Sequence, residues 1–428
     1  MKASPGSYEV LSKRESMNIL FVHEVDWLNK VVFDIHSLAE SLSLLGHQVF
    51  AIDYENTWSR DGFLNLGSLK TREFDGISRA FSRASVHLIR PGFIKIPGLS
   101  RISAAFTHYL EIQKTIRERN IDAIILYSIP TNGLQTIYLA RKFNIPVVFR
   151  SIDMLHQLVP YPVLRSVTKA LEKRVYSQVD TVLAITPQHL QYAKNMSAPA
   201  SKVKLLLFPI DTKIFQPGVD CSEVGHKWGL SERDKIVVFI GTLFEFSGLD
   251  VFIRQFPEII KQIPEAKLLI VGDGTQRSKL ERIIAKLGLQ KKAIITGFQP
   301  YQEMPQYINL ATVCINPFLI TEATRDFFPS KVVQYIACGK ATVATPVLGI
   351  TTLLHGESHG VIYANSADEM ARAVVSLVKS PERRQQLGYA GLNYVKQVHS
   401  YEKIAHQLET ILEEVIKEKR DGAVSKRV

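Results

Sequence analysis

The chain has 428 residues, of which 46% are hydrophobic and 22% are charged, and its formal net charge is +11 at pH 7. This length excludes a single ordinary core and predicts two domains. No apolar run approaches the roughly 20 residues that a membrane-spanning helix needs. The three cysteines are scattered without metal-ligand spacing, and without an export signal we expect reduced thiols in a cytoplasmic protein.

Residues 1–16 mix charged residues, proline and serine and lack the apolar centre of a signal peptide, so we expect a flexible extension before the first strand. Beyond it, apolar runs alternate with amphipathic helical stretches along nearly the whole chain. That alternation predicts parallel sheets with crossover helices. A helix is expected at 33–45, ending at Gly46. The strands expected in the first half are 19–22, 49–52, 123–127, 147–150 and 181–185.

Two basic stretches lie within this first half. Residues 70–101 carry seven basic and two acidic side chains between apolar ones, and residues 165–174 place four basic side chains on an expected helix. Such segments suit adsorption to an anionic membrane. A solvated face above ordinary core residues explains both stretches equally well, and the two interpretations stay open. Nucleic acid is a weaker explanation of the charge, because no recognised binding module is present.

A proline-punctuated stretch at 209–217 separates the two halves. A final helix at 401–419 is expected to pack back on the first domain, and the polar tail beyond Arg420 is expected to fray. The strands expected in the second half are 236–240, 267–271, 293–296, 313–316, 341–345 and 360–363.

The predicted fold is α/β, with two facing Rossmann-like, doubly wound parallel-sheet domains. We expect the first domain at 17–215, the second at 216–399, the returning helix at 400–420 and the tail at 421–428. Ligands bind off the carboxyl ends of the strands in such sheets, which predicts an active site in the cleft between the domains.

The stretch from 326 to 345 indicates a loop, a helix, a glycine stop and a buried strand. Pro329 suits the first helical turn and Gly339 suits the position just past the helix end. The free N–H groups of the helix N-terminus, with Lys331 beside them, therefore predict an anion site that suits a diphosphate. Taken alone, the pattern fits an ordinary strand-connecting helix equally well.

Several segments, in this order along the chain, carry a resemblance to a known family. The chain resembles the GT-B glycosyltransferases, specifically the large retaining group called glycosyltransferase family 4, from about Met17 to Lys419. The segments are the opening strand at 18–22 with the Gly-His-x-Val entry at 44–49, the interdomain element at 208–217, the strand and glycine turn at 266–274, the turn at 297–298, and the Ala-Cys-Gly-Lys end of the helix at 337–340.

The resemblance implies transfer of a sugar from a nucleotide-diphosphate sugar to an acceptor hydroxyl, with retention of configuration and without a metal or other cofactor. The basic, apolar first domain favours a lipid-linked or cell-surface acceptor and a peripheral location at the inner face of the cytoplasmic membrane. By resemblance, Asp326 holds sugar hydroxyls, and Asp153 and His156 are first-domain catalytic candidates. Glu24 and Asp26 follow the first strand, and an exposed loop pair is the favoured interpretation of them. The residues that the resemblance assigns to the nucleotide and donor are Gly272, Asp273, Gly274, Phe298, Ser330, Lys331 and Gln334.

The chain also departs from the family pattern. Where the family has Arg and Lys after the first strand of the donor domain, this chain has Thr242 and Ser247. Gln334 replaces a Glu, and residues 27–30 replace a glycine pair. Charge-assisted bonds to phosphate contribute roughly 1.5–3 kcal/mol each, so the missing cations matter. We favour their relocation to Arg325 and Lys331.

Two other classes stay open, a non-catalytic GT-B scaffold or partner subunit and a GT-B nucleotide-sugar epimerase. A dinucleotide oxidoreductase is disfavoured, because no Gly-x-Gly-x-x-Gly follows the first strand of either half.

Overall fold

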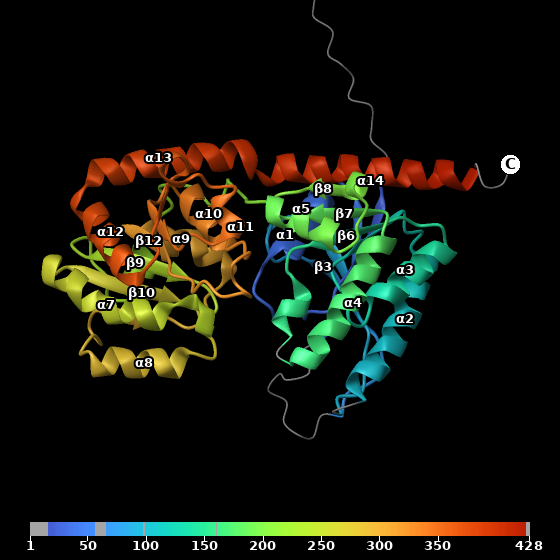
Figure 1. Ribbon diagram of the computed structural model, residues 1–428, viewed down its shortest axis with the longest axis horizontal. Helices are drawn as coiled ribbons and strands as arrows, with labels where there is room; N and C mark the ends of the chain where they lie inside the picture. The colour runs from blue at the N-terminus through green and yellow to red at the C-terminus, as the bar shows by residue number, and fades with distance from the viewer. Residues whose placement is uncertain (1–15, 56–65, 97–98, 160, 425–428) are drawn as a thin grey trace, which may run out of the picture.

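The computed structural model describes residues 16–55, 66–96, 99–159 and 161–424. Figure 1 shows two α/β lobes, with the helices α13 (Pro381–Val398) and α14 (Tyr401–Val424) running along one side of both. Each lobe is built on its own sheet, one of eight strands and one of six. The predicted architecture of two Rossmann-like lobes is therefore confirmed.

The first lobe has the strand order β3-β4-β2-β1-β5-β6-β7-β8, in which β3 alone runs antiparallel to its neighbour. Successive residues of β1 enter two different apolar clusters, so helices cover both faces of the sheet. The strands are β1 Asn18–Val22, β2 Gln48–Ile52, β3 Arg72–Ile77, β4 Val86–Arg90, β5 Ala123–Leu126, β6 Val147–Ser151, β7 Thr181–Ala184 and β8 Val203–Leu205. The helices are α1 Asp34–Leu44, α2 Ser100–Glu118, α3 Gly133–Lys142, α4 Pro162–Gln178 and α5 Pro187–Asn195, with a 3-10 turn at Leu155–Leu158.

The second lobe has a fully parallel sheet in the order β11-β10-β9-β12-β13-β14 around one large apolar cluster. The strands are β9 Lys235–Ile240, β10 Ala266–Val271, β11 Ala293–Ile295, β12 Val313–Asn316, β13 Thr342–Ala344 and β14 Val361–Tyr363. The helices are α6 Ser222–Lys227, α7 Leu249–Gln262, α8 Arg277–Lys286, α9 Met304–Leu310, α10 Ser330–Ala337, α11 Leu348–Thr351 and α12 Ala367–Lys379, before α13.

The chain returns to the first lobe through α14, which packs against α1. Ile404, Leu408 and Leu412 of α14 are buried in a cluster with residues of α1 and of the first sheet. Where the chain crosses back, Ile210 and Ser400 form an isolated parallel bridge. The helix continues to Val424, four residues beyond the end expected at residue 420, and residues 425–428 of the predicted tail lie outside the described part. The predicted extension is likewise outside it, apart from residue 16.

The stretch 70–101 is divided between core and surface. It forms β3 and β4, and its apolar residues Leu88, Ile89 and Phe93 are at most 2% exposed. Arg90 is buried and pairs with Asp26 and Asp53. The apolar residues of β4 are therefore core and cannot contact lipid, whereas β3 is largely exposed, and adsorption of this stretch to a membrane stays a prediction. None of the described helices is long and apolar enough to cross a bilayer.

The acidic pair after β1 is not an exposed loop pair, because Asp26 is buried and Glu24 is partly buried. Asp26 is 5% exposed and its carboxylate binds the Arg90 guanidinium at 2.6 Å. Glu24 accepts hydrogen bonds from the backbone N–H groups of Thr131 and Asn132, both at 2.7 Å. Both carboxylates thus fix the first-lobe loops in place.

Candidate functional site

A cavity of roughly 660 Å³ lies between the two lobes. The first lobe contributes Ser78, Arg79 and residues 29–33, which follow β1, and the second lobe contributes the carboxyl ends of β9 and β10 and the start of α10. Ligand sites in proteins commonly measure about 300–1,000 Å³. The cavity therefore has room for a nucleotide-sized ligand at the edge where doubly wound sheets bind one.

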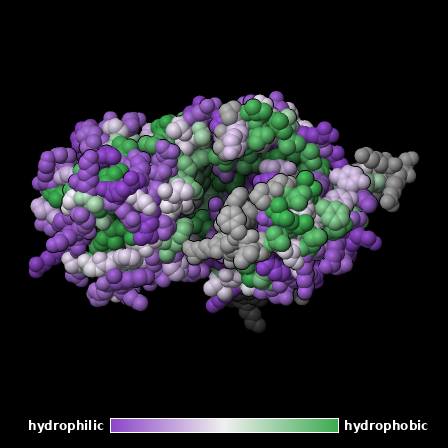
Figure 2. All heavy atoms as spheres, turned by 90° about the horizontal axis from the view of Figure 1, so that it is seen from below, coloured by the Kyte–Doolittle hydropathy of each residue, from purple (hydrophilic) through white to green (hydrophobic). Residues whose placement is uncertain are grey.

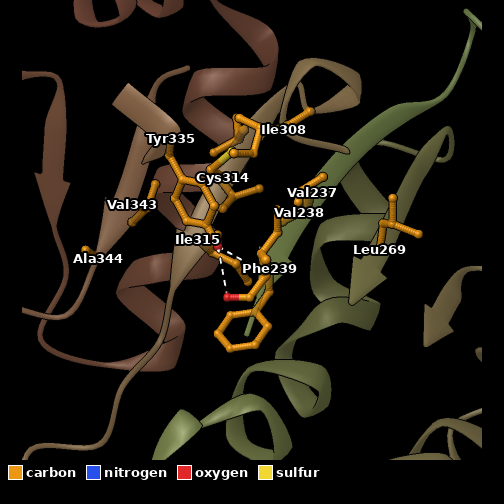
Figure 3. Packing of buried hydrophobic residues seen from close by; sticks show 14 of the residues in the cluster. Val237, Val238, Phe239, Leu269, Ile308, Cys314, Ile315, Tyr335, Val343 and Ala344 are labelled. Carbon is orange, nitrogen blue, oxygen red and sulfur yellow. Dashed lines mark hydrogen bonds between the residues drawn. The ribbon is translucent and has the colours of Figure 1, made fainter. Parts of the chain in front are cut away.

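The helix α10 starts at the point where two strands of the second sheet separate. The ladder between β9 and β12 ends at Val238, and beyond it the Tyr335 hydroxyl accepts a hydrogen bond from the Ile240 N–H at 2.7 Å. Figure 3 shows this ring reaching from α10 to β9 among buried apolar side chains. Val332, Val333 and Ile336 are fully buried. The helix is thus held at a switch point in strand order, with its first turn towards the cavity.

The first turn of α10 leaves its backbone donors available. Pro329 stands at the N-cap, one position before the expected first turn, and no side chain caps the helix. Ser330 and Lys331 both line the cavity. An uncapped helix N-terminus presents N–H groups and the positive end of the helix dipole, which together favour a bound anion.

Lys331 places an ammonium group in this wall without a counter-charge. The Nζ atom lies 4.2 Å from the ring centroid of Phe239 and 4.8 Å from that of Phe318. Burial lowers the pKa of Lys331 from 10.5 to about 7. Across the described residues, no carboxylate pairs with it within 4.0 Å. Gly241 lies beside the ammonium with φ +146°, a conformation that favours glycine, and a Cβ atom there would lie 2.3 Å from the Nζ atom, which would have to shift.

Six of the predicted donor residues line the cavity. Gln334 faces it and donates to the Tyr301 hydroxyl at 3.4 Å. The Phe298 ring is 61% exposed, which leaves a flat apolar surface free for a ligand. The six are Thr242, Gly272, Phe298, Ser330, Lys331 and Gln334.

Three other predicted residues shape turns and are not among the cavity-lining residues. Ser247 is 2% exposed, and its hydroxyl donates to the Phe244 carbonyl at 2.7 Å. Asp273 accepts from the Arg277 guanidinium at 2.8 Å. Gly274 packs tightly on Leu243, where a Cβ atom would lie 2.6 Å from the carbonyl oxygen. The structure therefore gives these three a structural role.

Arg325 and Asp326 pair with each other. The guanidinium lies 3.2 Å from the Asp326 carboxylate, and neither residue lines the cavity. The Arg325 side chain is 57% exposed, while the Asp326 side chain is 8% exposed. The predicted relocation of charge to Arg325 stays a prediction, and in this structure the guanidinium pairs with its neighbour Asp326. Relocation to Lys331 agrees with the geometry.

The first-lobe candidates follow β6. Asp153 is partly buried, and within the described chain no hydrogen bond or ion pair engages its carboxylate. Burial, and then the charge of Asp34, raise the pKa of Asp153 to about 6, while Lys30 opposes the rise. Asp153 itself is not among the residues that line the cavity.

His156 lies in the 3-10 turn three residues further on, and a buried carboxylate orients it. Its Nδ1 atom lies 2.6 Å from Glu172, which is fully buried. Glu172 also accepts from the His156 backbone N–H at 3.1 Å and from the Tyr192 hydroxyl at 3.1 Å. This arrangement directs the other ring nitrogen, Nε2, away from the pair. Sequence reasoning missed Glu172, although it is the one acidic residue within the basic stretch 165–174.

Sequence reasoning also missed Lys30 and Arg79 as cavity residues. The only signal for Lys30 was its place in the segment that replaces a glycine pair. Arg79 offered no signal, since the fold brings the turn after β3 to the cavity. Among the described residues, no group of three or more His, Cys, Asp or Glu side chains gathers as a metal site.

Comparisons with known proteins agree with this architecture. Residues 32–207 match the model of the glycosyl transferase 4-like domain, and residues 234–380 match that of glycosyl transferases group 1. A GDP-mannose-dependent alpha-(1-6)-phosphatidylinositol monomannoside mannosyltransferase of Mycolicibacterium smegmatis is 27% identical over 232 residues, which cover 53% of this chain and 60% of the relative. An alpha-D-kanosaminyltransferase of Streptomyces kanamyceticus is 23% identical, with 65% and 73% covered.

Solved structures show the same fold. Anabaena HepE, in complex with UDP, matches with a TM-score of 0.68 at 15% identity, covering 93% of this chain and all of that one. A sucrose-phosphate synthase of Thermosynechococcus elongatus matches with a TM-score of 0.70 at 17% identity, covering 94% of this chain and all of that one. Matching models across both lobes, on this architecture, show that the chain belongs to the GT-B glycosyltransferases of the family 4 type.

Proposed function

We propose that the protein transfers a sugar from a nucleotide-diphosphate sugar to an acceptor hydroxyl, with retention of configuration and without a metal ion. The observation that carries this proposal is the uncapped first turn of α10, with the unpaired Lys331 beside it, in a cavity of roughly 660 Å³ between the lobes. The bound UDP of Anabaena HepE and the GDP-mannose dependence in the name of the mycobacterial relative support this class of donor.

The chemistry follows from where charge develops. As the bond from the sugar to the diphosphate breaks, negative charge grows on the leaving phosphate oxygen. The N–H groups of α10 and the Lys331 ammonium are fixed beforehand at this wall, and preorganised donors of this kind stabilise a transition state. A metal ion is not needed when a helix N-terminus and a cation meet the charge.

In the first lobe, Asp153 and His156 are the proposed residues for the transferred sugar and the acceptor, although neither is among the residues that line the cavity. With a pKa of about 6, the Asp153 carboxyl is ionised at neutral pH and can accept a hydrogen bond from a sugar hydroxyl. The Nε2 atom of His156 is available because Glu172 binds the Nδ1 side. In a front-face reaction the leaving phosphate removes the acceptor proton, so neither residue has to act as a strong base.

We propose a lipid-linked acceptor at an anionic membrane surface. Ile102 and Phe106 of α2 are 68% and 63% exposed, and Val163 of α4 is 81% exposed. Figure 2 shows apolar side chains gathered on the first lobe next to the hollow between the lobes. The exposed basic residues of α4 are Arg165, Lys169, Lys173 and Arg174. Apolar groups beside cations suit the headgroup region of anionic lipid. The phosphatidylinositol acceptor in the name of the mycobacterial relative supports this choice.

A panel of nucleoside diphosphates in a thermal-shift assay tests the donor site first. A ligand at a hundred times its dissociation constant stabilises by about 2.7 kcal/mol, so one base should stand out. Incubation with the matching nucleotide sugar and an acceptor extract should then release the nucleoside diphosphate and form a product that keeps the donor's anomeric configuration, read by NMR. Release of an isomerised nucleotide sugar would assign the protein to the epimerases. Binding without turnover of any donor would make it a scaffold.

Flotation with liposomes tests the acceptor surface. Vesicles with 30% phosphatidylglycerol should carry the protein, and vesicles of phosphatidylcholine alone should not. Replacing Val163 and Val167 by Ser should reduce the floated fraction, whereas the same change at an exposed second-lobe residue, Val251, should not. Equal flotation on both kinds of vesicle would argue against charge recognition.

A further inference from the structure

The loop between β1 and α1 is rigid although it carries no glycine pair. The backbone N–H of Trp27 donates to Asp53 at 2.8 Å, and the N–H groups of Leu28 and Asn29 both donate to Asp26 at 3.0 Å. The Trp27 ring is 1% exposed. The backbone that leads to residue 30 is therefore fixed by two buried carboxylates.

Arg79 completes this anchoring from the other side. Its Nη1 atom donates to the Lys30 carbonyl at 2.7 Å and to the Trp27 carbonyl. Its backbone N–H donates to the buried Glu40 at 2.7 Å. Although Arg79 lines the cavity, its guanidinium already binds the loop carbonyls, so it acts as a positioning residue for the loop.

The Lys30 side chain is different, because it is exposed and lines the same cavity as Lys331. No ion pair or hydrogen bond engages its ammonium anywhere in the described chain. The positive charge of Lys30 nevertheless acts on a nearby candidate residue, since it lowers the pKa of Asp153. The first lobe therefore presents one uncommitted cation to the cavity from a fixed backbone.

The second lobe alone offers too little positive charge for a diphosphate. The diphosphate of a nucleotide sugar is a diester with two negative charges. In the second lobe, Thr242 is neutral, and neither the buried Ser247 nor the paired Arg325 lines the cavity. That leaves Lys331 and the first turn of α10. A dianion between surfaces of low dielectric is stabilised best when both charges are met.

We infer that Lys30 is the second cation of the diphosphate site and that a nucleotide diphosphate is held between the two lobes, by Lys30 on one side and by Lys331 with the α10 N-terminus on the other. This inference rests on the proposed donor class. It also makes the nucleotide a bridge, adding to the cross-lobe bonds from Gln302 to the Arg79 carbonyl at 3.1 Å and from Thr352 to Gln188 at 2.7 Å. A ligand that contacts only one of the two lobes should not link them.

Isothermal titration of the purified full chain with the nucleoside diphosphate that the panel selects, and with its nucleoside, tests the inference. Lys30→Gln should weaken diphosphate binding by about 10-fold to 100-fold and change nucleoside binding less than about twofold. Lys30→Arg should restore most of the affinity. The matched control is Lys202→Gln, which removes one charge from an exposed first-lobe site away from the cavity.

The outcomes separate this inference from the proposed function. Wild-type affinity of Lys30→Gln for the diphosphate would overturn the role of Lys30 and leave the donor site standing. If Lys202→Gln weakened diphosphate binding equally, the loss of affinity would follow net charge alone. That result would also overturn the role of Lys30. If the wild-type chain bound no nucleoside diphosphate, the proposed function itself would fail. X-ray scattering adds an independent readout, since the diphosphate should compact the wild-type protein and not Lys30→Gln.

Discussion

Two buried charges of the first lobe, Arg150 and Glu172, and one charge in the cavity wall of the second lobe, Lys331, are handled in opposite ways. In the first lobe, Arg150 is fully buried and binds both oxygens of Asp34 at 2.8–2.9 Å. Glu172 is equally buried and is surrounded by four donors. In the second lobe, the Lys331 ammonium faces two aromatic rings and no carboxylate within the described residues.

This difference teaches how to distinguish structural charges from functional ones. A buried charge with a complete set of partners contributes to a unique arrangement of the chain, and its removal damages the fold. A partly buried cation without a partner, such as Lys331, lowers the stability of the empty protein. Such a group is a functional-site candidate, because a ligand can supply the missing charge. The following predictions test that distinction.

Arg150→Met should have the largest effect on stability. It leaves the Asp34 carboxylate buried, with only the Tyr127 hydroxyl at 2.8 Å as a side-chain partner. Breaking a buried pair on one side costs about 3–5 kcal/mol. Urea unfolding at pH 7 measures the loss. Lys331→Met serves as the comparison and should show no loss, so an equal loss in both variants would remove the distinction between paired and unpaired charges.

Lys331→Met should instead abolish most of the activity. Removal of one preorganised donor to developing charge lowers kcat by roughly 10²-fold to 10³-fold. Lys331→Arg keeps the charge and should retain more activity than Lys331→Met. The matched control, Lys286→Met on the exposed face of α8, should behave as wild type. Steady-state kinetics with the donor found in the panel measure kcat for each variant. Full activity of Lys331→Met would exclude a role of Lys331 in the chemistry.

Much of this fold could be predicted from the sequence, and the exceptions have physical causes. Strands buried on both faces, such as β9 and β10, are continuous apolar runs and were predicted to within a residue. The strands β3, β4 and β8 were missed. The edge strand β3 is largely exposed and rich in charge, β4 lies in the same basic stretch, and β8 has only three residues. Local pattern cannot show pairing that the tertiary structure imposes.

The site was predictable where it is local in sequence. The start of α10 and Lys331 lie within one helical turn, so helix signals located both. Arg325 pairs with the adjacent Asp326 and is not among the cavity-lining residues, a placement that adjacency in sequence does not reveal. Lys30 reaches the cavity from the other lobe, and only the packed structure brings it opposite Lys331. Neither periodicity nor spacing carries that information.

The pH dependence of stability should reveal the unpaired lysine. Between pH 7 and about 10.5, the folded protein leaves Lys331 neutral while the unfolded chain still binds a proton there. Stability rises with pH wherever the unfolded state binds more protons, so the free energy of unfolding should increase across this window, by roughly 1–3 kcal/mol from this group. Urea unfolding of Lys331→Met should lack this rise relative to wild type. A parallel pH profile in the two proteins would mean that the ammonium is hydrated or paired in solution.

Tyr335→Phe should have the smallest effect, and it tests how firmly the second-lobe wall is built. The hydroxyl meets the Ile240 N–H at the point where β9 and β12 have already separated, so its loss leaves a buried donor without this partner. We expect destabilisation of about 1 kcal/mol, because the ring and its packing remain. We also expect the KM for the donor to rise by a few-fold, since the same contact positions the first turn of α10. Phe256→Leu, a core change away from the cavity, provides the control for stability alone. If Tyr335→Phe lowered stability and left the donor KM unchanged, α10 would be positioned by its buried apolar face and not by this hydrogen bond.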